Sequence, residues 1–93
     1  EKLILSLWSE ASAEAEIGRI DRGAAATPFT LAHNVASVEA VDAAIAEAVA
    51  AGATLITAPV HRDWGGYSGY IADPDGFRWE IAFNPSELGE SLL

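Results

Sequence analysis

The sequence predicts an α+β fold in which a strand, a helix and three more strands follow one another, with an extra strand near the N-terminus. Three observations predict it. Apolar residues recur with a helical period between Val38 and Val49. Apolar and polar residues alternate from Phe77 to Phe83, as in a strand with one buried face. The run Asp73-Pro74-Asp75-Gly76 before that strand is typical of a tight turn.

The first part of the chain gives the weaker signals. Leu3–Trp8 is apolar, β-prone and short enough to be the extra strand. From Ser9 to Ala26 the pattern weakens, although Ala11, Ala15 and Ile17 could line one side of a short helix. The glycines and alanines that follow predict a connecting loop.

The stretch Pro28–Val35 predicts the first strand of the main unit. Its alternation puts Thr30 and Asn34 on one face and His33 on the opposite face. Because His33 has apolar neighbours, we interpret it as a structural histidine rather than a ligand or a base.

The helix is the most regular element of the sequence. Ser37 is a typical N-cap residue, and the apolar stripe predicts a helix from there to about Ala51. Gly52 then provides a residue that readily takes the left-handed conformation in which many helices end. One helix of this kind is enough to cover one face of a sheet.

Three strands are predicted after the helix. They are Thr54–Thr57, ended by Pro59, then Tyr67–Ala72, and finally Phe77–Phe83, ended by Pro85; a polar loop over His61–Gly66 separates the first two. In the last strand Arg78 and Glu80 lie on the face opposite the apolar one. A polar second face of this kind is either solvated or lines a cleft.

Composition excludes several classes of function. The 93 residues carry 14 acidic and 5 basic side chains, a net charge of −9, and no cysteine. This acidity argues against nucleic acids and anionic membranes as partners, and the lack of cysteine excludes disulfides, thiol nucleophiles and Cys-ligated metals. No apolar run reaches the roughly 20 residues that span a bilayer, and residues 1–8 do not resemble a signal peptide. The lack of cysteine leaves the compartment open, and a cytoplasmic location is expected.

The C-terminal two thirds resembles a known family. The runs Phe29–Val35, Trp64–Tyr70 and Asp73–Glu80, with the helix between the first two, are similar to the second module of the vicinal-oxygen-chelate superfamily, which includes glyoxalase I, bleomycin-resistance proteins and extradiol dioxygenases. The resemblance implies a βαβββ module over 28–86, with a half-closed mixed sheet and one covering helix. Residues 1–27 would be the last strand of a preceding module and a linker, and 87–93 a C-terminal tail.

The resemblance also bears on metal binding. Metal-dependent members of the superfamily place a His on the first strand of this module and a Glu on its last strand. Glu80 matches the Glu position, but the His position falls on Thr30, and Leu3–Trp8 holds no carboxylate where the preceding module would supply one. We therefore predict no cofactor and an incomplete metal site, in which Glu80 is the only matching ligand.

The resulting hypothesis is a protein that binds a small organic molecule in a cavity between sheets, with catalytic residues and activity unassigned. The candidate ligand-binding residues are Thr30, Asn34, Trp64, Tyr70, Arg78 and Glu80. For Glu80 the alternative is a solvated side chain or a partner of Arg78. Two other functions stay open: a metal-dependent lyase or dioxygenase whose divalent metal is completed by a partner chain, and an assembly module with no ligand.

The resemblance finally predicts a partner. The superfamily pairs two modules around one cavity, so a single module leaves an open sheet face and an unpaired strand edge. A second copy related by a two-fold axis is the simplest partner, so a homodimer is expected. A stable folded monomer in sedimentation at micromolar concentration would contradict this expectation.

Overall fold

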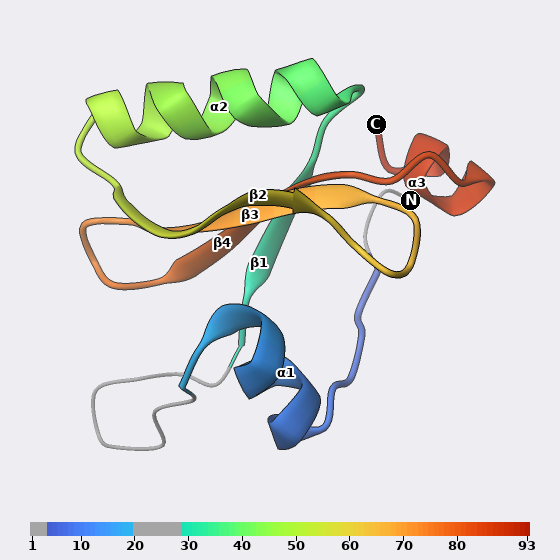
Figure 1. Cartoon of the computed structure of the whole chain (residues 1–93), viewed down its shortest axis with the longest axis horizontal. Coiled ribbons are helices and arrows are strands. Elements are labelled where there is room, and N and C mark those ends of the chain that lie inside the picture. Colours follow the sequence, from blue (N-terminus) through green and yellow to red (C-terminus); the bar gives the residue numbers. More distant parts are fainter. Residues whose placement is uncertain (1–3, 20–28) are drawn as a thin grey trace.

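The part of the chain that the structure describes forms a four-stranded sheet with helices on both sides (Figure 1). The structure, a computed structural model, describes residues 4–19 and 29–93. Its elements are α1 (Glu10–Ile17), β1 (Leu31–Asn34), α2 (Val38–Ala50), β2 (Thr54–His61), β3 (Tyr67–Ala72), β4 (Arg78–Phe83) and α3 (Glu87–Ser91). The strand order is β1-β4-β3-β2, with β1 parallel to β4 and the other pairs antiparallel. The predicted α+β class and βαβββ order are confirmed.

Helix α2 packs on one face of the sheet and forms the core with it. The Ser37 side chain accepts a hydrogen bond from the Ala40 amide at 3.0 Å, as expected of an N-cap, and Gly52 follows the helix with φ +117°. Among the described residues, the buried side chains of the core between α2 and the sheet come from the helix and from two strands: Val41, Ile45, Ile71 and Ile81. The periodic apolar stripe therefore packs as predicted.

Helix α1 lies on the opposite side of the sheet from α2 (Figure 1). Its N-cap is Ser9, whose hydroxyl accepts from the Ser12 amide at 3.1 Å, and it buries Ala13 and Ile17. A short helix in this region was predicted, but its buried side was predicted wrongly, because Ala11 and Ala15 are exposed. The second face of the sheet is therefore covered in part by α1.

The predicted extra strand over Leu3–Trp8 is wrong for the residues that the structure describes. Ile4 to Trp8 have no strand structure, and Leu5 and Leu7 are 88% and 90% exposed; Leu3 lies outside the described residues. Apolar, β-prone residues form a strand only where a neighbouring strand offers its backbone groups. No described strand pairs with this segment.

The boundaries of three other elements differ from the prediction. Strand β1 spans Leu31–Asn34 and is shorter than the predicted Pro28–Val35, of which Pro28 lies outside the described residues. Strand β2 continues through Pro59 to His61 instead of ending at Thr57. A proline is tolerated there because β2 is an edge strand and its pairing with β3 is irregular around this residue. Helix α3 occupies part of the predicted C-terminal tail and is capped by Ser86, whose hydroxyl accepts from the Gly89 amide at 3.2 Å.

The turn between β3 and β4 has the predicted form. Asp73 Oδ1 accepts hydrogen bonds from the amides of Asp75 and Phe77, each at 3.0 Å. Gly76 has φ +88°, which a side chain would disfavour. This turn fixes the register of β3 against β4 and so pairs Tyr70 with Glu80. None of the helices in the described parts of the chain is long and apolar enough to cross a membrane.

Candidate functional site

Most of the predicted site residues lie on the side of the sheet that faces α1. Tyr70 on β3 and Glu80 on β4 are cross-strand neighbours. Arg78 pairs with Ala72, two positions along, and so projects to the same side. On β1, Asn34 pairs with Ala82 and belongs to this side as well. The alternation thus brings these four predicted residues to one face of the sheet.

Two predicted residues are placed differently. Trp64 is 48% exposed in the loop between β2 and β3, where its ring lies close to Gly66, and no contact with Tyr70 or Glu80 places it in the same cluster. Thr30 comes just before β1, and its hydroxyl is buried without a hydrogen-bond partner among the described residues.

Tyr70 is the centre of the cluster. Its side chain is fully buried, and its hydroxyl lies 3.1 Å from Glu80 Oε2. The same hydroxyl is hydrogen-bonded to Glu16 Oε2, which reaches it from α1. A phenol that carries one proton can donate to only one carboxylate at a time, so the two carboxyl groups share this hydroxyl.

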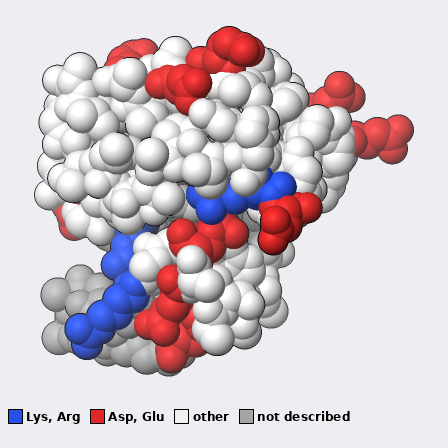
Figure 2. Space-filling view, viewed as in Figure 1, with Lys and Arg blue, Asp and Glu red and all other residues white. Residues whose placement is uncertain are grey.

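Arg62 supplies the positive charge. Its Nε donates to Ser68 Oγ and its Nη2 to the Ser68 carbonyl oxygen, each at 3.0 Å. The guanidinium carbon lies 5.4 Å from the centre of the Tyr70 ring, within range of a cation–π contact. We call the five residues Glu16, Arg62, Ser68, Tyr70 and Glu80 the tyrosine cluster. In Figure 2 basic and acidic side chains meet in the band between the sheet and α1.

The cluster shifts the acidity of two of its members. Burial, followed by the hydrogen bond to Glu16, raises the pKa of Tyr70. Burial also raises the pKa of Glu80, and the charge of Glu16 adds to that effect. Hydrogen bonds from Ser68 and Tyr70 act in the opposite direction but do not cancel it. Glu80 is therefore a carboxyl group that holds its proton more tightly than an exposed one.

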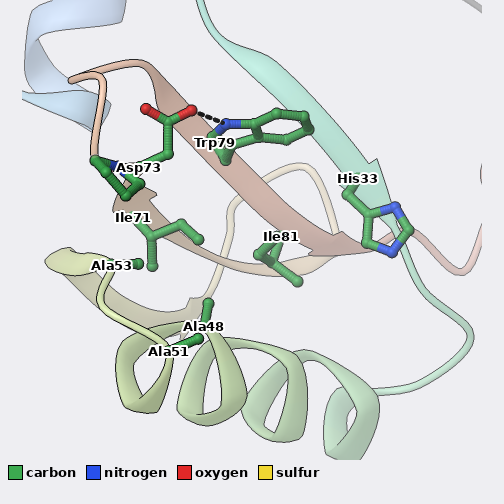
Figure 3. Close-up of a pocket in the computed structure, with 9 residues that line it drawn as sticks. His33, Ala48, Ala51, Ala53, Ile71, Asp73, Trp79 and Ile81 are labelled. Atoms are coloured by element: carbon green, nitrogen blue, oxygen red, sulfur yellow. Dashed lines mark hydrogen bonds between the residues drawn. The ribbon is translucent and has the colours of Figure 1, made fainter.

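A groove of about 420 Å³ opens on the other side of the sheet (Figure 3). Its walls are mostly apolar and include Ala48, Ile81 and Trp79, whose Nε1 donates to Asp73 Oδ2 at 3.0 Å. His33 lines the same groove, on the side of the sheet that carries α2. The prediction that His33 points away from the face of Glu80 is confirmed. It is exposed, because β1 lies at the edge of the sheet.

Comparison with known proteins identifies the family. The family model described as Glyoxalase/Bleomycin resistance protein/Dioxygenase superfamily matches residues 4–81. The chain belongs to this superfamily. None of the curated proteins matches the sequence.

Solved structures of the superfamily agree with the fold. A glyoxalase-related enzyme from Fulvimarina pelagi is 37% identical, with a TM-score of 0.60 over 84% of this chain and 55% of that one. A glyoxalase/bleomycin resistance protein/dioxygenase family enzyme from Burkholderia phytofirmans PsJN is 34% identical, with a TM-score of 0.62 over 67% of this chain and 49% of that one. The chain thus spans about half the length of the structures it matches.

The donor set does not fit the divalent metal that the superfamily often holds. Thr30, at the position of the expected His, offers a neutral hydroxyl, which is a much poorer ligand than an imidazole. Glu80 has a raised pKa, and a bound proton competes with a metal ion for a carboxylate. Within residues 4–19 and 29–93, no three His, Asp or Glu side chains gather in a way that could hold an ion. The ligands that these residues offer are therefore poorly suited to a divalent cation.

Three residues of the tyrosine cluster were not predicted from the sequence. Ser68 could have been found, because it alternates with Tyr70 on the same strand. Arg62 sits in the loop that follows β2 and bends back onto Ser68. Glu16 lies 54 residues away from Tyr70 in the sequence, and no local pattern links the two.

The raised pKa of Glu80 predicts a pH-dependent stability. The folded protein holds this proton more tightly than the unfolded chain, so the stabilisation is complete below a pH of about 4.3 and is lost as the pH rises through the folded pKa. Glu80→Gln is neutral at every pH. We expect it to be more stable than the wild type near pH 8 and to lose that advantage near pH 4, by about 1.4 kcal/mol for each unit of pKa elevation.

Urea denaturation followed by circular dichroism at both pH values measures this difference. Asp63→Asn is the control, because it removes a carboxylate from the exposed loop after β2 without touching the cluster. If Glu80→Gln and Asp63→Asn depend on pH in the same way, Glu80 does not carry the effect.

Proposed function

We propose that this chain binds a small organic molecule on the face of the sheet that carries the tyrosine cluster, in a cavity between this sheet and a second one, and that it does so without a complete metal site. The observation that carries the proposal is the cluster itself. A buried phenol hydroxyl, a carboxyl group of raised pKa and a guanidinium group converge on one sheet face.

Structural stability alone would not favour this arrangement. Polar groups in a protein interior cost free energy unless each is paired, and apolar residues of similar volume often give equal or greater stability. A few polar side chains that converge on one point are, however, what orients a small ligand in a pocket. The membership of the superfamily supports the same proposal, since the solved relatives include an enzyme described as glyoxalase-related.

The alternative of an assembly module is favoured by a separate observation. Three large apolar side chains near the β1 edge are partly exposed, Phe29 at 48%, Leu31 at 39% and Phe77 at 43%. The outer edge of β1 is also unpaired among the described strands. A second copy of the chain stays a prediction, and this edge is the surface that it would cover. Such a partner is compatible with ligand binding, because Leu31, which pairs with Trp79, projects to the side of α2 and not to the side of the tyrosine cluster.

A thermal-shift experiment with two matched tyrosine variants tests the ligand-binding proposal. The probes are benzamide, benzoate, benzylamine and benzyl alcohol, which attach four polar groups to similar aromatic bodies. A probe that binds only the folded state at about 100 times its Kd adds about 2.7 kcal/mol, which raises Tm by several degrees. We expect at least one probe to do so in the wild type.

Tyr70→Phe should abolish the gain, whereas Tyr67→Phe should keep it. Tyr67 lies on the same strand but faces α2, where its hydroxyl donates to Asp42 at 2.7 Å. Each variant removes one phenol hydroxyl from one side of the sheet. The proposal fails if no probe raises Tm, or if the two variants lose the gain equally.

A further inference from the structure

We propose that the carboxyl group of Glu16 occupies, on the tyrosine cluster, the place of a carboxyl group of the ligand, so that α1 is a built-in competitor and the ligand is a small carboxylic acid. This inference rests on the proposed function, and it adds to it the class of ligand and the element that must move for binding.

The first support is the origin of Glu16. The other four members of the cluster belong to β3, to β4 or to the loop that joins β2 to β3. Glu16 comes instead from the helix on the far side of the cluster, and its carboxyl group enters from outside the sheet to reach a fully buried hydroxyl. A carboxyl group carried by a separate molecule would approach this face from the same direction.

The second support is the donors that the cluster presents. Arg62 uses Nε and Nη2 for Ser68, so of its five N–H groups three have no hydrogen-bond partner among the described residues. They lie beside the Tyr70 ring, whose hydroxyl is a further donor. Glu16 reaches the Tyr70 hydroxyl but leaves these N–H groups without a bond. A ligand carboxylate in its place would accept from Tyr70 and also pair with the guanidinium, which an amide or an alcohol would do less well.

The third support is that the site already accepts a carboxyl group next to Glu80. Two carboxylates in contact repel each other, yet here the Tyr70 hydroxyl is hydrogen-bonded to both and Arg62 lies close to its ring. The protein carries a net charge of −9, so its general field disfavours anionic ligands. If an anion binds here, its binding is therefore due to the hydrogen-bond donors of the tyrosine cluster and not to the net charge of the protein.

The fourth support is the contact that holds α1 in place. The helix has only eight residues, which is too short to be stable by itself. It is anchored to the sheet side by burial of Ala13 and Ile17 and by the hydrogen bond from Tyr70 to Glu16. A ligand that takes over the hydrogen bond competes with the helix. Its apparent Kd is higher the smaller the fraction of protein molecules in which Glu16 has left the Tyr70 hydroxyl.

The experiment measures probe affinity in two glutamate variants of the same helix. Glu16→Ala removes the internal competitor. Glu14→Ala is the control, because it makes the same change of charge and side chain two residues away at an exposed position. Benzoate, benzamide and benzylamine are titrated into each protein, and binding is followed by the NMR shifts of the Arg62 Nε–H and the Ser68 amide.

We expect benzoate to bind Glu16→Ala at least about tenfold more tightly than it binds the wild type or Glu14→Ala, while benzamide and benzylamine change much less. In the wild type, saturating benzoate should also accelerate amide exchange in α1 and leave exchange in α2 unchanged. Protection of the α2 amides in each variant shows that the sheet and its core remain folded.

The possible failures are distinct. If the affinity for benzamide increases as much as the affinity for benzoate in Glu16→Ala, the site binds ligands but the carboxylic acid is the wrong class of ligand. If Glu14→Ala increases the affinity for benzoate as much as Glu16→Ala does, the effect comes from the change of charge, and Glu16 is not a competitor. If no probe binds any of the proteins, the proposed function itself fails. Glu16→Gln keeps a hydrogen-bonding side chain and should fall between Glu16→Ala and the wild type.

Discussion

Tyr70→Ala is expected to lower the unfolding free energy by about 3–5 kcal/mol, the usual cost of truncating a fully buried aromatic side chain. The ring of Tyr70 has no exposed surface, and its removal leaves a cavity in the middle of the sheet. Small domains have only about 5–15 kcal/mol of stability in total. Much of the variant should therefore be unfolded near physiological temperature.

The same strand provides the control. Tyr67 is half-buried, and its hydroxyl bonds to Asp42 on the exposed side of α2, so Tyr67→Ala should cost clearly less than Tyr70→Ala. Tyr70→Phe keeps the ring and should cost about 1–3 kcal/mol, because Glu16 and Glu80 lose their shared donor. Urea denaturation of the three variants gives these values. If Tyr67→Ala and Tyr70→Ala lowered the free energy of unfolding equally, the buried position of Tyr70 would not contribute the extra stability expected of it.

Local signals in the sequence were sufficient for much of the fold. The helix could be predicted because its cap at Ser37, its apolar stripe and the glycine at 52 lie in one continuous stretch of the chain. The β3–β4 hairpin could be predicted because Asp73 and Gly76 specify its turn chemically. In both, the information that determines the structure is local in the chain.

The site could be predicted only in part, because its contacts cross the chain. Tyr70 and Glu80 were found because the hairpin aligns them. Glu16 was not, since α1 reaches the sheet through a tertiary contact that no periodicity records. The strand expected at Leu3–Trp8 failed for a related reason. A strand needs a neighbour, and the composition of a segment does not reveal whether one is present.

At Pro59 the rule that proline ends a strand predicted the wrong boundary for β2, and the pairing of β2 with Gly69 on β3 shows why. Proline commonly ends a strand, yet β2 continues past it. In the register, Thr57 pairs with Tyr70 and Val60 with Ser68, so two residues of β2 lie opposite Gly69 alone. This is the geometry of a β-bulge, which an edge strand tolerates.

The bulge makes Gly69 the second position at which a small change should have a large effect. A Cβ atom there would lie 2.9 Å from both the Pro59 nitrogen and the Thr57 carbonyl oxygen, and 2.7 Å from Ile45 Cδ1. The end of the Ile45 side chain can move, but the backbone of β2 can move only if the bulge is remodelled. We expect Gly69→Ala to cost about 3 kcal/mol, the upper part of the range for overpacking.

Gly52→Ala separates this steric effect from the conformational cost of losing a glycine. Gly52 has φ +117° and open space where a Cβ atom would lie, so Gly52→Ala meets no steric contact and should cost only the backbone strain of a side chain at positive φ, about 1–2 kcal/mol. Gly69 is not among the glycines of positive φ, and so the cost of Gly69→Ala comes from steric contact with the backbone of β2 and the end of the Ile45 side chain. Urea denaturation of the two variants compares the effects directly. A smaller cost for Gly69→Ala than for Gly52→Ala would show that β2 adjusts freely, and that the bulge at Pro59 does not depend on a glycine opposite it.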